Sequence, residues 1–135
     1  MKSLIVEDEF VSRAILLEFL SPYGPCNVAV NGDEAIAAVA QSLESDAPYD
    51  LICLDIMMPG CCSGTDVLAT VRELESAAGV MLGDGAKVFM TTAMDDSEHV
   101  LASFRASCDA YLVKPVKRDK LHELVHEHLN RQLPA

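Results

Sequence analysis

The sequence predicts an α/β fold in which helices pack on both faces of a doubly wound parallel sheet of five strands. Five short apolar runs alternate along the chain with segments whose apolar residues recur at helical spacing. This alternation favours parallel strand pairing with right-handed crossovers. No linker, repeat or low-complexity segment interrupts the pattern, and 135 residues suffice for one core. We therefore expect a single domain over residues 1–135, with no output domain.

The first part of the chain predicts two short strands, each followed by a helix. Residues 4–6 form the first strand and residues 26–30 the second. The helix between them should end in the Pro- and Gly-containing segment 21–25. Asn31, with Glu34 three residues later, is typical of an N-cap pair for the next helix. The expected apolar faces of these two helices are Val11, Ile15 and Phe19, then Ile36, Val39 and Leu43.

The third strand ends in a lone carboxylate. Residues 51–54 are four consecutive apolar residues that run into Asp55, and Pro59-Gly60 breaks the chain soon after. A continuous apolar run of this length is typical of a strand buried on both faces. Asp55 should then lie at the carboxyl end of the strand, where open α/β sheets bind ligands. Taken singly, an aspartate before Pro-Gly is more typical of a turn.

Two further strands complete the predicted sheet. Residues 88–90 form the fourth and run into Thr91-Thr92-Ala93, and residues 110–113 form the fifth, which ends at Lys114-Pro115. The segment 79–85 contains three glycines. It lacks the spacing and the lysine of a phosphate-binding loop, so we interpret it as a turn.

Three more helices are expected, after the third, fourth and fifth strands. The first of them follows the loop that ends at Gly64, and the second should begin at Asp95, with Glu98 as its capping partner. Their expected inner faces are Val67, Leu68, Val71 and Leu74; Val100, Leu101 and Phe104; and Leu121, Leu124, Val125, His128 and Leu129.

The composition excludes several classes of function. The net charge is −11, from 21 acidic and 10 basic residues. Such an acidic surface repels phosphate backbones, so direct nucleic-acid binding is not expected. No apolar run approaches the length of a membrane span, and the N-terminus does not resemble a signal peptide. The five cysteines are an odd number without a Cys-x-x-Cys pair, which favours free thiols in a reducing cytoplasm.

Chemically distinctive residues follow four of the five predicted strands. Glu7 and Asp8 follow the first strand, Asp55 the third, Thr92 the fourth and Lys114 the fifth. The carboxyl ends of parallel strands share one edge of a sheet, and carboxylates that converge there repel one another unless a cation lies among them. With no His or Cys nearby, the expected ion is Mg²⁺. Together with a lysine and a hydroxyl, these acids suit phosphoryl transfer, with Asp55 as the covalent acceptor.

Each of these residues also has a structural explanation. The run Glu7-Asp8-Glu9 favours a helix N-terminus. Thr91-Thr92 are ordinary residues for a strand end, and Lys114-Pro115 is typical of a turn. Any one of them is more often structural than functional, but their joint occurrence at successive strand ends favours a site.

The motifs at these strand ends resemble those of the receiver domains of bacterial two-component response regulators, the family typified by the chemotaxis regulator. The motifs are Leu-Ile-Val-Glu7-Asp8, Leu-Asp55-Ile-Met-Met-Pro-Gly, Thr92-Ala93 and Tyr111-Leu-Val-Lys114-Pro115. The resemblance covers essentially the whole chain. It implies the flavodoxin-like strand order 2-1-3-4-5.

The resemblance implies that Asp55 accepts a phosphoryl group from a histidine kinase or a histidine phosphotransfer protein, as a switch or a member of a phosphorelay. It also implies that Mg²⁺ is the cofactor, bound by Glu7, Asp8, Asp55 and the backbone carbonyl of Met57. The protein would be a cytoplasmic regulator that catalyses only its own phosphotransfer and dephosphorylation.

Further roles follow from the same resemblance. Thr92 and Lys114 would bind the phosphoryl oxygens, and Lys114-Pro115 would be a cis peptide. Tyr111 would turn inward when Thr92 moves toward the phosphate, and the surface around it would report the change to a downstream protein target. Phosphorylation could also cause two copies of the protein to form a homodimer.

The sequence departs from the family pattern in three places. The loop Cys61-Cys62-Ser63 is one residue longer than usual, Ser107 stands where a glycine commonly ends the fourth helix, and the connection 75–86 is long. None of these departures touches the acidic cluster. The adjacent cysteines could sense oxidation, although ordinary loop thiols are the simpler interpretation. A receiver that never takes up phosphate and serves as a docking module is the alternative within the family, and the complete set of acids, threonine and lysine disfavours it.

One motif indicates a different class of function, a metal-dependent hydrolase. The segment His122-Glu123-Leu124-Val125-His126 matches the His-Glu-x-x-His pattern of zinc peptidases. A catalytic zinc needs a third protein ligand, and only nine residues follow His126. The buried stripe of the helix places both histidines on or beside its solvated face, which favours adventitious metal binding.

Two methionines predict a long-lived phosphate. Hydrolysis of an aspartyl phosphate needs a water in line with the phosphorus, and a polar side chain beside the site can orient that water. The positions best placed to supply it lie two residues after Asp55 and two residues after Thr92, and they hold Met57 and Met94. A thioether is a weak acceptor, so slow self-dephosphorylation is expected. Alternatively, both methionines only cover apolar surface.

Overall fold

The strands of the sheet are parallel and lie in the order β2-β1-β3-β4-β5, which confirms the predicted fold class. The computed structural model describes residues 1–58, 64–81, 83–93 and 108–131. The strands are β1 (Ser3–Val6), β2 (Cys26–Ala29), β3 (Leu51–Asp55), β4 (Lys87–Thr92) and β5 (Ala110–Val113).

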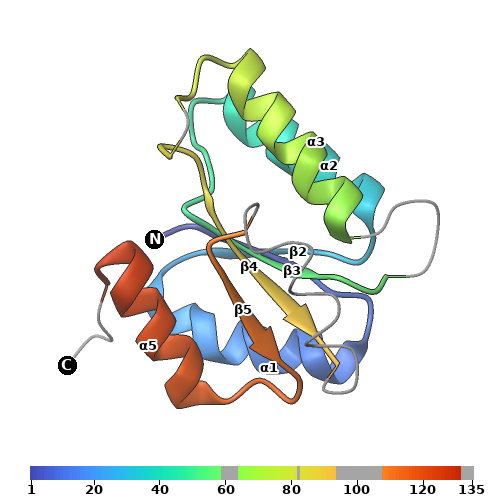
Figure 1. The fold of residues 1–135 in the computed structure, drawn as a ribbon, viewed down its shortest axis with the longest axis vertical. Coiled ribbons are helices and arrows are strands. Elements are labelled where there is room, and N and C mark those ends of the chain that lie inside the picture. The colour runs from blue at the N-terminus through green and yellow to red at the C-terminus, as the bar shows by residue number, and fades with distance from the viewer. Residues whose placement is uncertain (59–63, 82, 94–107, 132–135) are drawn as a thin grey trace.

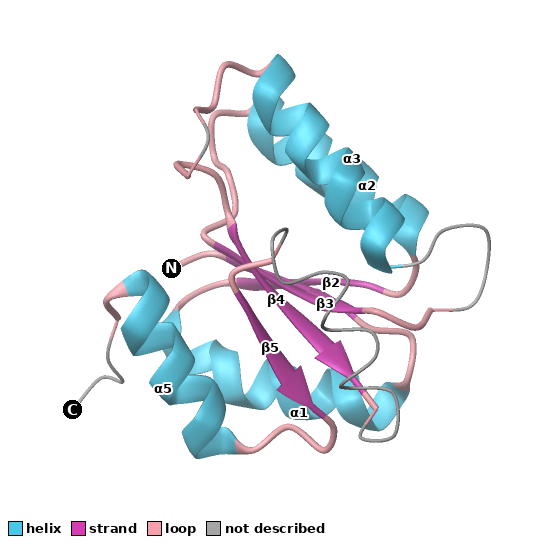
Figure 2. Cartoon of the chain, in the orientation of Figure 1, coloured by secondary structure: helices cyan, strands magenta, loops and turns pink. Residues whose placement is uncertain are grey.

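Helices cover both faces of the sheet (Figures 1 and 2). α1 (Phe10–Leu20) and α5 (Arg118–Leu129) lie on one face, and α2 (Gly32–Glu44) and α3 (Gly64–Ala77) lie on the other. In the described residues, no helix has both the length and the apolar character that a membrane span requires. The helix expected between β4 and β5, which includes Asp95, Glu98, Val100, Leu101, Phe104 and Ser107, lies outside the described residues, as do Cys61, Cys62 and Met94.

Every residue of β3 is buried, as its apolar run predicts. Successive side chains alternate between the faces of the sheet. Ile52 and Leu54 belong to the core under α2 and α3, whereas Leu51 and Cys53 belong to the core under α1 and α5. Both cores therefore hold this strand in place, and its carboxyl end carries Asp55.

The inner face of α1 differs from the prediction. Leu16 and Leu20 are its buried residues, whereas Val11 is 58% exposed and Ile15 and Phe19 are only partly buried. Apolar residues occupy both stripes of this helix, so spacing could not decide which stripe faces the sheet. The packing of α1 beside α5 decides it.

The predicted N-cap of α2 is confirmed. The backbone N–H of Glu34 donates to Asn31 Oδ1 at 2.8 Å, and the Glu34 carboxylate accepts from the backbone N–H of Val30 at 3.1 Å. These bonds satisfy backbone groups that a helix start leaves without partners. Val39 is buried as predicted, and Ile36 and Leu43 pack against the same core while remaining partly exposed.

In α5 the predicted apolar stripe is confirmed at Leu121, Leu124 and Val125, which are buried. His128 and Leu129 are only partly buried, and the ring of His128 packs edge-on against Phe89, with centroids 5.6 Å apart. Both residues lie in the last turn of the helix.

A buried carboxylate anchors the long connection between α3 and β4. Glu75 accepts a hydrogen bond from the backbone N–H of Ala86 at 2.7 Å and forms a 2.7 Å ion pair with Arg72. Arg72 also lies 3.4 Å from Asp109, whose carboxylate accepts from the backbone N–H of Val88. Gly79 and Gly83 have positive φ angles, as the predicted turn requires.

Candidate functional site

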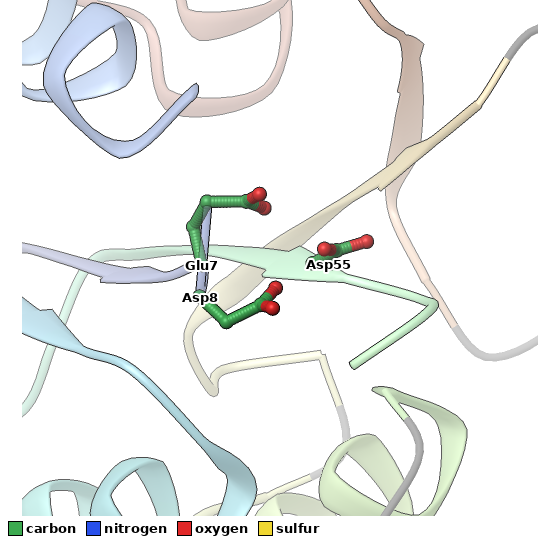
Figure 3. Close-up of side chains that lie close together, drawn as sticks. All are labelled: Glu7, Asp8 and Asp55. Carbon is green, nitrogen blue, oxygen red and sulfur yellow. The ribbon is translucent and has the colours of Figure 1, made fainter. Parts of the chain in front are cut away.

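Three carboxylates meet at the carboxyl edge of the sheet. Glu7 and Asp8 directly follow β1, and Asp55 ends β3. One oxygen from each of the three lies within 4.8 Å of the others. Glu7 and Asp55 are buried, and Asp8 is exposed. Figure 3 shows the carboxylates of Glu7 and Asp8 pointing toward the end of β3 that carries Asp55.

The acidic run 7–9 divides into two roles. The carboxylate of Glu9 caps α1, because it accepts hydrogen bonds from the backbone N–H groups of Val11 at 3.1 Å and Ser12 at 2.6 Å. The bond from Ser12 is the main cause that lowers the pKa of Glu9. Within this acidic run, only Glu9 serves the start of the helix. The carboxylates of Glu7 and Asp8 belong to the site.

Lys114 joins the cluster from β5. Its Nζ donates to Glu7 Oε1 at 2.8 Å and to Asp55 Oδ2 at 3.2 Å. Burial by itself lowers the pKa of Lys114, but the hydrogen bond to Glu7 and the charges of Asp55 and Glu7 outweigh burial and raise it. The ammonium is therefore charged at neutral pH. The Lys114-Pro115 peptide is cis, as predicted.

The Glu7 carboxylate is in an unfavourable position for a charge. Burial raises its pKa to about 7, Lys114 opposes this rise and the charge of Asp55 adds to it. Lys114 holds Oε1, whereas the buried Oε2 has no hydrogen-bond partner among the described residues. An additional cation would satisfy this oxygen and favour the ionised form.

The donor atoms of the cluster fit a hard divalent cation. All of them are carboxylate oxygens, which Mg²⁺ prefers, and Asp8 is open to solvent, so retained water ligands have room. The predicted fourth ligand, the Met57 carbonyl, stays a prediction. The backbone N–H of Met57 donates to Asp55 Oδ1 at 3.1 Å, and its side chain is 62% exposed at the edge of the site.

Thr92 ends β4 and Tyr111 lies on the neighbouring strand β5. Thr92 is buried at the end of β4, and its hydroxyl donates to the carbonyl of Ala93 at 3.3 Å. Tyr111 on β5 is partly buried against the core under α2 and α3. Their roles in phosphoryl binding and switching stay predictions.

The sequence of this chain matches a known protein family. The sequence model of the response regulator receiver domain matches residues 3–126. The chain belongs to this family. The receiver domain is 37% identical over 115 residues to the transcriptional regulatory protein ResD of Bacillus subtilis, which covers 84% of the chain and 42% of ResD. The chain spans about half or less of the length of the curated relatives it matches.

Solved structures of receiver domains share this fold. One is the receiver domain of the sensor histidine kinase PA1611 from Pseudomonas aeruginosa, with a magnesium ion in its active site cleft. It has a TM-score of 0.75 at 21% identity, over 96% of this chain and 98% of that chain. Another is the Saccharomyces cerevisiae complex of the histidine phosphotransfer protein Ypd1 with the receiver domain of Ssk1. The TM-score is again 0.75, at 25% identity over 94% of this chain and 87% of that chain.

The zinc-peptidase motif of α5 does not build a comparable centre. His122 is partly buried between α1 and α5, and its ring packs edge-on against Phe19 and Tyr23. Its Nε2 lies 3.3 Å from the carbonyl of Phe19. His126 is exposed. In the described part of the receiver domain, the acidic cluster is the only group of three or more potential metal ligands that lie close together.

Two residues that shape the receiver site were missed as site residues by sequence reasoning. Arg13 donates to the backbone carbonyls of Glu7 and Asp8, both at 3.2 Å, and so fixes the turn that carries the two acids. Gly64 starts α3 against the backbone of Asp55, and any side chain there would collide with it. No sequence motif or spacing identifies Arg13 as a site residue, and in the sequence Gly64 looks like an ordinary loop residue.

The raised pKa of Glu7 predicts a pH-dependent stability for the metal-free protein. A folded pKa of about 7 lies above the ordinary value of 4.5, so the folded state holds this proton more tightly than the unfolded state does. The resulting stabilisation is complete below pH 4.5 and is lost as the pH rises through 7. Glu7→Gln should therefore be more stable than wild type at pH 8, by on the order of 2–3 kcal/mol.

Urea unfolding of both proteins between pH 5 and pH 8, in a chelator, measures this difference. Carboxylates that do not interact with Glu7 titrate alike in the two proteins and cancel. Added Mg²⁺ should reduce the advantage of Glu7→Gln, because the cation binds the ionised wild-type site. A difference in stability that does not change with pH would contradict the raised pKa.

Proposed function

We propose that this receiver domain accepts a phosphoryl group on Asp55 from a histidine kinase or a histidine phosphotransfer protein, in a reaction that requires Mg²⁺. The observation that carries the proposal is the meeting of Glu7, Asp8 and Asp55 with the ammonium of Lys114 at one edge of the sheet. The similarity to the receiver of Ssk1, solved with a phosphotransfer protein, supports this class of donor.

The residues suit a defined transfer reaction. A carboxylate oxygen of Asp55 attacks the phosphorus, and the bond from phosphorus to the donor's imidazole nitrogen breaks, leaving the electron pair on that nitrogen. Lys114 neutralises charge on the phosphoryl oxygens, and the Thr92 hydroxyl donates to one of them after a local movement. Glu7, Asp8, Asp55 and the Met57 carbonyl would hold Mg²⁺, which would neutralise further charge on the phosphoryl oxygens.

The output of the reaction is a change of surface. Tyr111 on the edge strand β5 is partly buried and adjoins β4, which ends at Thr92. A movement of Thr92 toward the phosphate frees space on that side of the sheet, and Tyr111 turns into it. The altered face then binds a downstream protein partner or a second copy of the domain. Residues 1–135 act in this proposal as one receiver unit whose only catalysis is its own phosphorylation and dephosphorylation.

The described cysteines support a reducing compartment for this exchange, and we place it in the cytoplasm. Cys26, Cys53 and Cys108 are free, and burial raises the pKa of each thiol, that of Cys53 to about 12. Thiols of raised pKa react slowly in any compartment, so the argument for a reducing one rests on the free state of the three described cysteines. A redox role for Cys61 and Cys62 remains a prediction.

The test of the proposed function is phosphorylation of the purified protein by a small acyl-phosphate donor. Intact-mass measurement should show one added phosphoryl group when Mg²⁺ is present and none when a chelator replaces it. Absence of labelling with the small donor, and also with a phosphorylated phosphotransfer protein, would favour the docking-module alternative.

Met57 is predicted to prolong the life of the phosphate. Its side chain lies at the edge of the site and cannot orient an attacking water well. Met57→Asn should speed the loss of phosphate by about tenfold, which corresponds to a barrier lower by about 1.4 kcal/mol. The measurement is the decay of labelled protein after removal of the donor.

Met81→Asn is the matched control, because Met81 is 74% exposed and lies in the connection before β4, whereas the phosphate would lie at the carboxyl ends of the strands. It should decay like wild type. Met94→Glu is the companion variant at the second predicted position. If neither Met57→Asn nor Met94→Glu speeds the decay, the methionines do not protect the phosphate, and Mg²⁺ and Lys114 set the rate.

A further inference from the structure

Two buried hydroxyl groups in the sheet, those of Ser3 on β1 and Thr91 on β4, have no hydrogen-bond partner among the described residues. Ser3 lies at the amino ends of the strands, whereas Thr91 lies at their carboxyl ends, where Asp55 is its neighbour in the register. Thr91 on β4 is 0% exposed, and its Oγ1 makes no hydrogen bond to any described residue. Valine has nearly the same shape and would fill this position without burying an unpaired polar group. Because an unpaired hydroxyl destabilises the fold, its presence requires an explanation.

Thr91 lies in the row of the sheet that carries the phosphoacceptor. In the strand register it stands beside Asp55 of β3 and beside Leu112 of β5. Alternate residues of a strand point to the same face of the sheet, and Phe89 belongs to the core under α1 and α5, as does Leu112. The side chain of Thr91 therefore points to that same face.

The side chain of Lys114 spans this position. Lys114 comes two residues after Leu112, and its Nζ reaches Glu7 beyond β1 and Asp55 at the end of β3. β4 lies between β5 and β3, so the side chain of Lys114 passes the carboxyl end of β4 to reach Asp55, and Thr91 is the residue of β4 that stands beside Asp55 in the register. The ammonium has three N–H donors, and its two hydrogen bonds in this structure go to the two carboxylates.

A cation and Lys114 compete for the same oxygens. Lys114 holds Glu7 Oε1 and Asp55 Oδ2, and both carboxylates belong to the cluster that fits Mg²⁺. When the carboxylates bind a cation, the ammonium is repelled from Glu7 and loses a charge-assisted hydrogen bond. It then needs another acceptor close to Asp55. Thr91 stands between Asp55 of β3 and Leu112 of β5 in the register, and its oxygen has no partner among the described residues.

We propose that Thr91 is a positioning residue for Lys114. Its hydroxyl accepts a hydrogen bond from the ammonium once the carboxylates hold their cation, and this bond keeps the ammonium beside Asp55, where the phosphoryl group arrives. The inference rests on the proposed function of the site. It explains why a hydroxyl that destabilises the resting protein is present: the hydroxyl gains its partner in the loaded site.

The test compares Thr91→Val, which removes the hydroxyl and keeps the shape, with Thr91→Ser, which keeps the hydroxyl. In a chelator, Thr91→Val should melt about 2–8 °C above wild type, because the unpaired group is gone.

With Mg²⁺ present, the effect of Thr91→Val should reverse. Calorimetric titration should show that its Mg²⁺ affinity is about tenfold lower than that of wild type, and its acyl-phosphate labelling at saturating Mg²⁺ should be about tenfold slower. Thr91→Ser should have the Mg²⁺ affinity and the labelling rate of wild type. Thr70→Val on α3, where the hydroxyl bonds to the Asp66 carbonyl, should leave affinity and labelling unchanged.

The possible outcomes separate the inference from the proposed function. If wild type is labelled and Thr91→Val binds Mg²⁺ and labels equally well, the positioning role is wrong while the function stands. A lower melting temperature for metal-free Thr91→Val, or its failure to fold, shows that the hydroxyl is already paired in the resting state and also overturns the inference. The inference is also overturned if Thr91→Ser loses as much Mg²⁺ affinity and labelling rate as Thr91→Val. If wild type itself takes up no phosphate, the proposed function fails, and the Mg²⁺ titration and melting curves still decide the role of Thr91.

Discussion

Asp55→Asn should abolish phosphorylation of the protein by an acyl-phosphate donor. The amide keeps the size of the side chain but is a very weak nucleophile, so no acyl phosphate forms. The expected loss of labelling rate is on the order of 10³-fold or more, a barrier higher by about 4 kcal/mol. Intact-mass measurement over time, followed by mapping of the labelled peptide, gives the result directly.

The matched control is Asp84→Asn, which makes the same change of charge at an exposed residue of the connection before β4. It should label like wild type. Asp55→Asn must also stay folded, which the circular dichroism of both variants establishes. Labelling of Asp55→Asn at the wild-type rate would place the phosphoacceptor elsewhere and would contradict the proposed function.

Asp8 and Lys114 should affect Mg²⁺ binding and phosphotransfer in different ways. Asp8→Asn removes a metal ligand, so Mg²⁺ affinity should fall by on the order of 10- to 100-fold, and labelling at limiting Mg²⁺ should fall with it. Lys114→Ala removes the positive charge that holds Glu7 and Asp55, so Mg²⁺ affinity should be unchanged or higher. Labelling by Lys114→Ala should nevertheless drop by about 10²-fold at saturating Mg²⁺, because the phosphoryl oxygens lose a cationic donor.

Calorimetric titration with Mg²⁺ and labelling rates at saturating Mg²⁺ separate the two roles. Lys87→Ala is the control for the lysine, since Lys87 lies at the start of β4, on the opposite edge of the sheet, 3.9 Å from Asp109. It should not alter either measurement. An equal loss of Mg²⁺ affinity in Asp8→Asn and Lys114→Ala would refute the division of roles.

The fold could be predicted because its signals are local. The apolar run of β3 marks a strand buried on both faces, and the confirmed N-cap of α2 depends on residues three positions apart. Such patterns follow from the period of a strand or a helix and from its first turn. The inner face of α1 could not be predicted in this way, because that helix has apolar residues on more than one stripe.

The strand-end positions of Glu7, Asp8, Asp55 and Lys114 also follow from the sequence, because any residue after a parallel strand of this fold reaches the same edge. The sequence does not determine which of these side chains bond to one another. Lys114 and Glu7 are 107 residues apart, and their 2.8 Å bond exists because β5 and β1 lie in one sheet with a fixed register. Glu9 looks like its acidic neighbours in the sequence, and only its place at the start of α1 makes it a cap.

The sequence by itself thus determined the fold class, the family motifs and the candidate site, because strand and helix periods and strand-end residues are properties of neighbours along the chain. Only the tertiary structure decided that Lys114 occupies the oxygens a cation needs and that the Thr91 hydroxyl has no partner in the part of the chain that the structure describes. The physical reason is that hydrogen bonds and ion pairs form over about 3 Å, a scale set by register and packing. No spacing along the chain encodes a distance of that size between different strands.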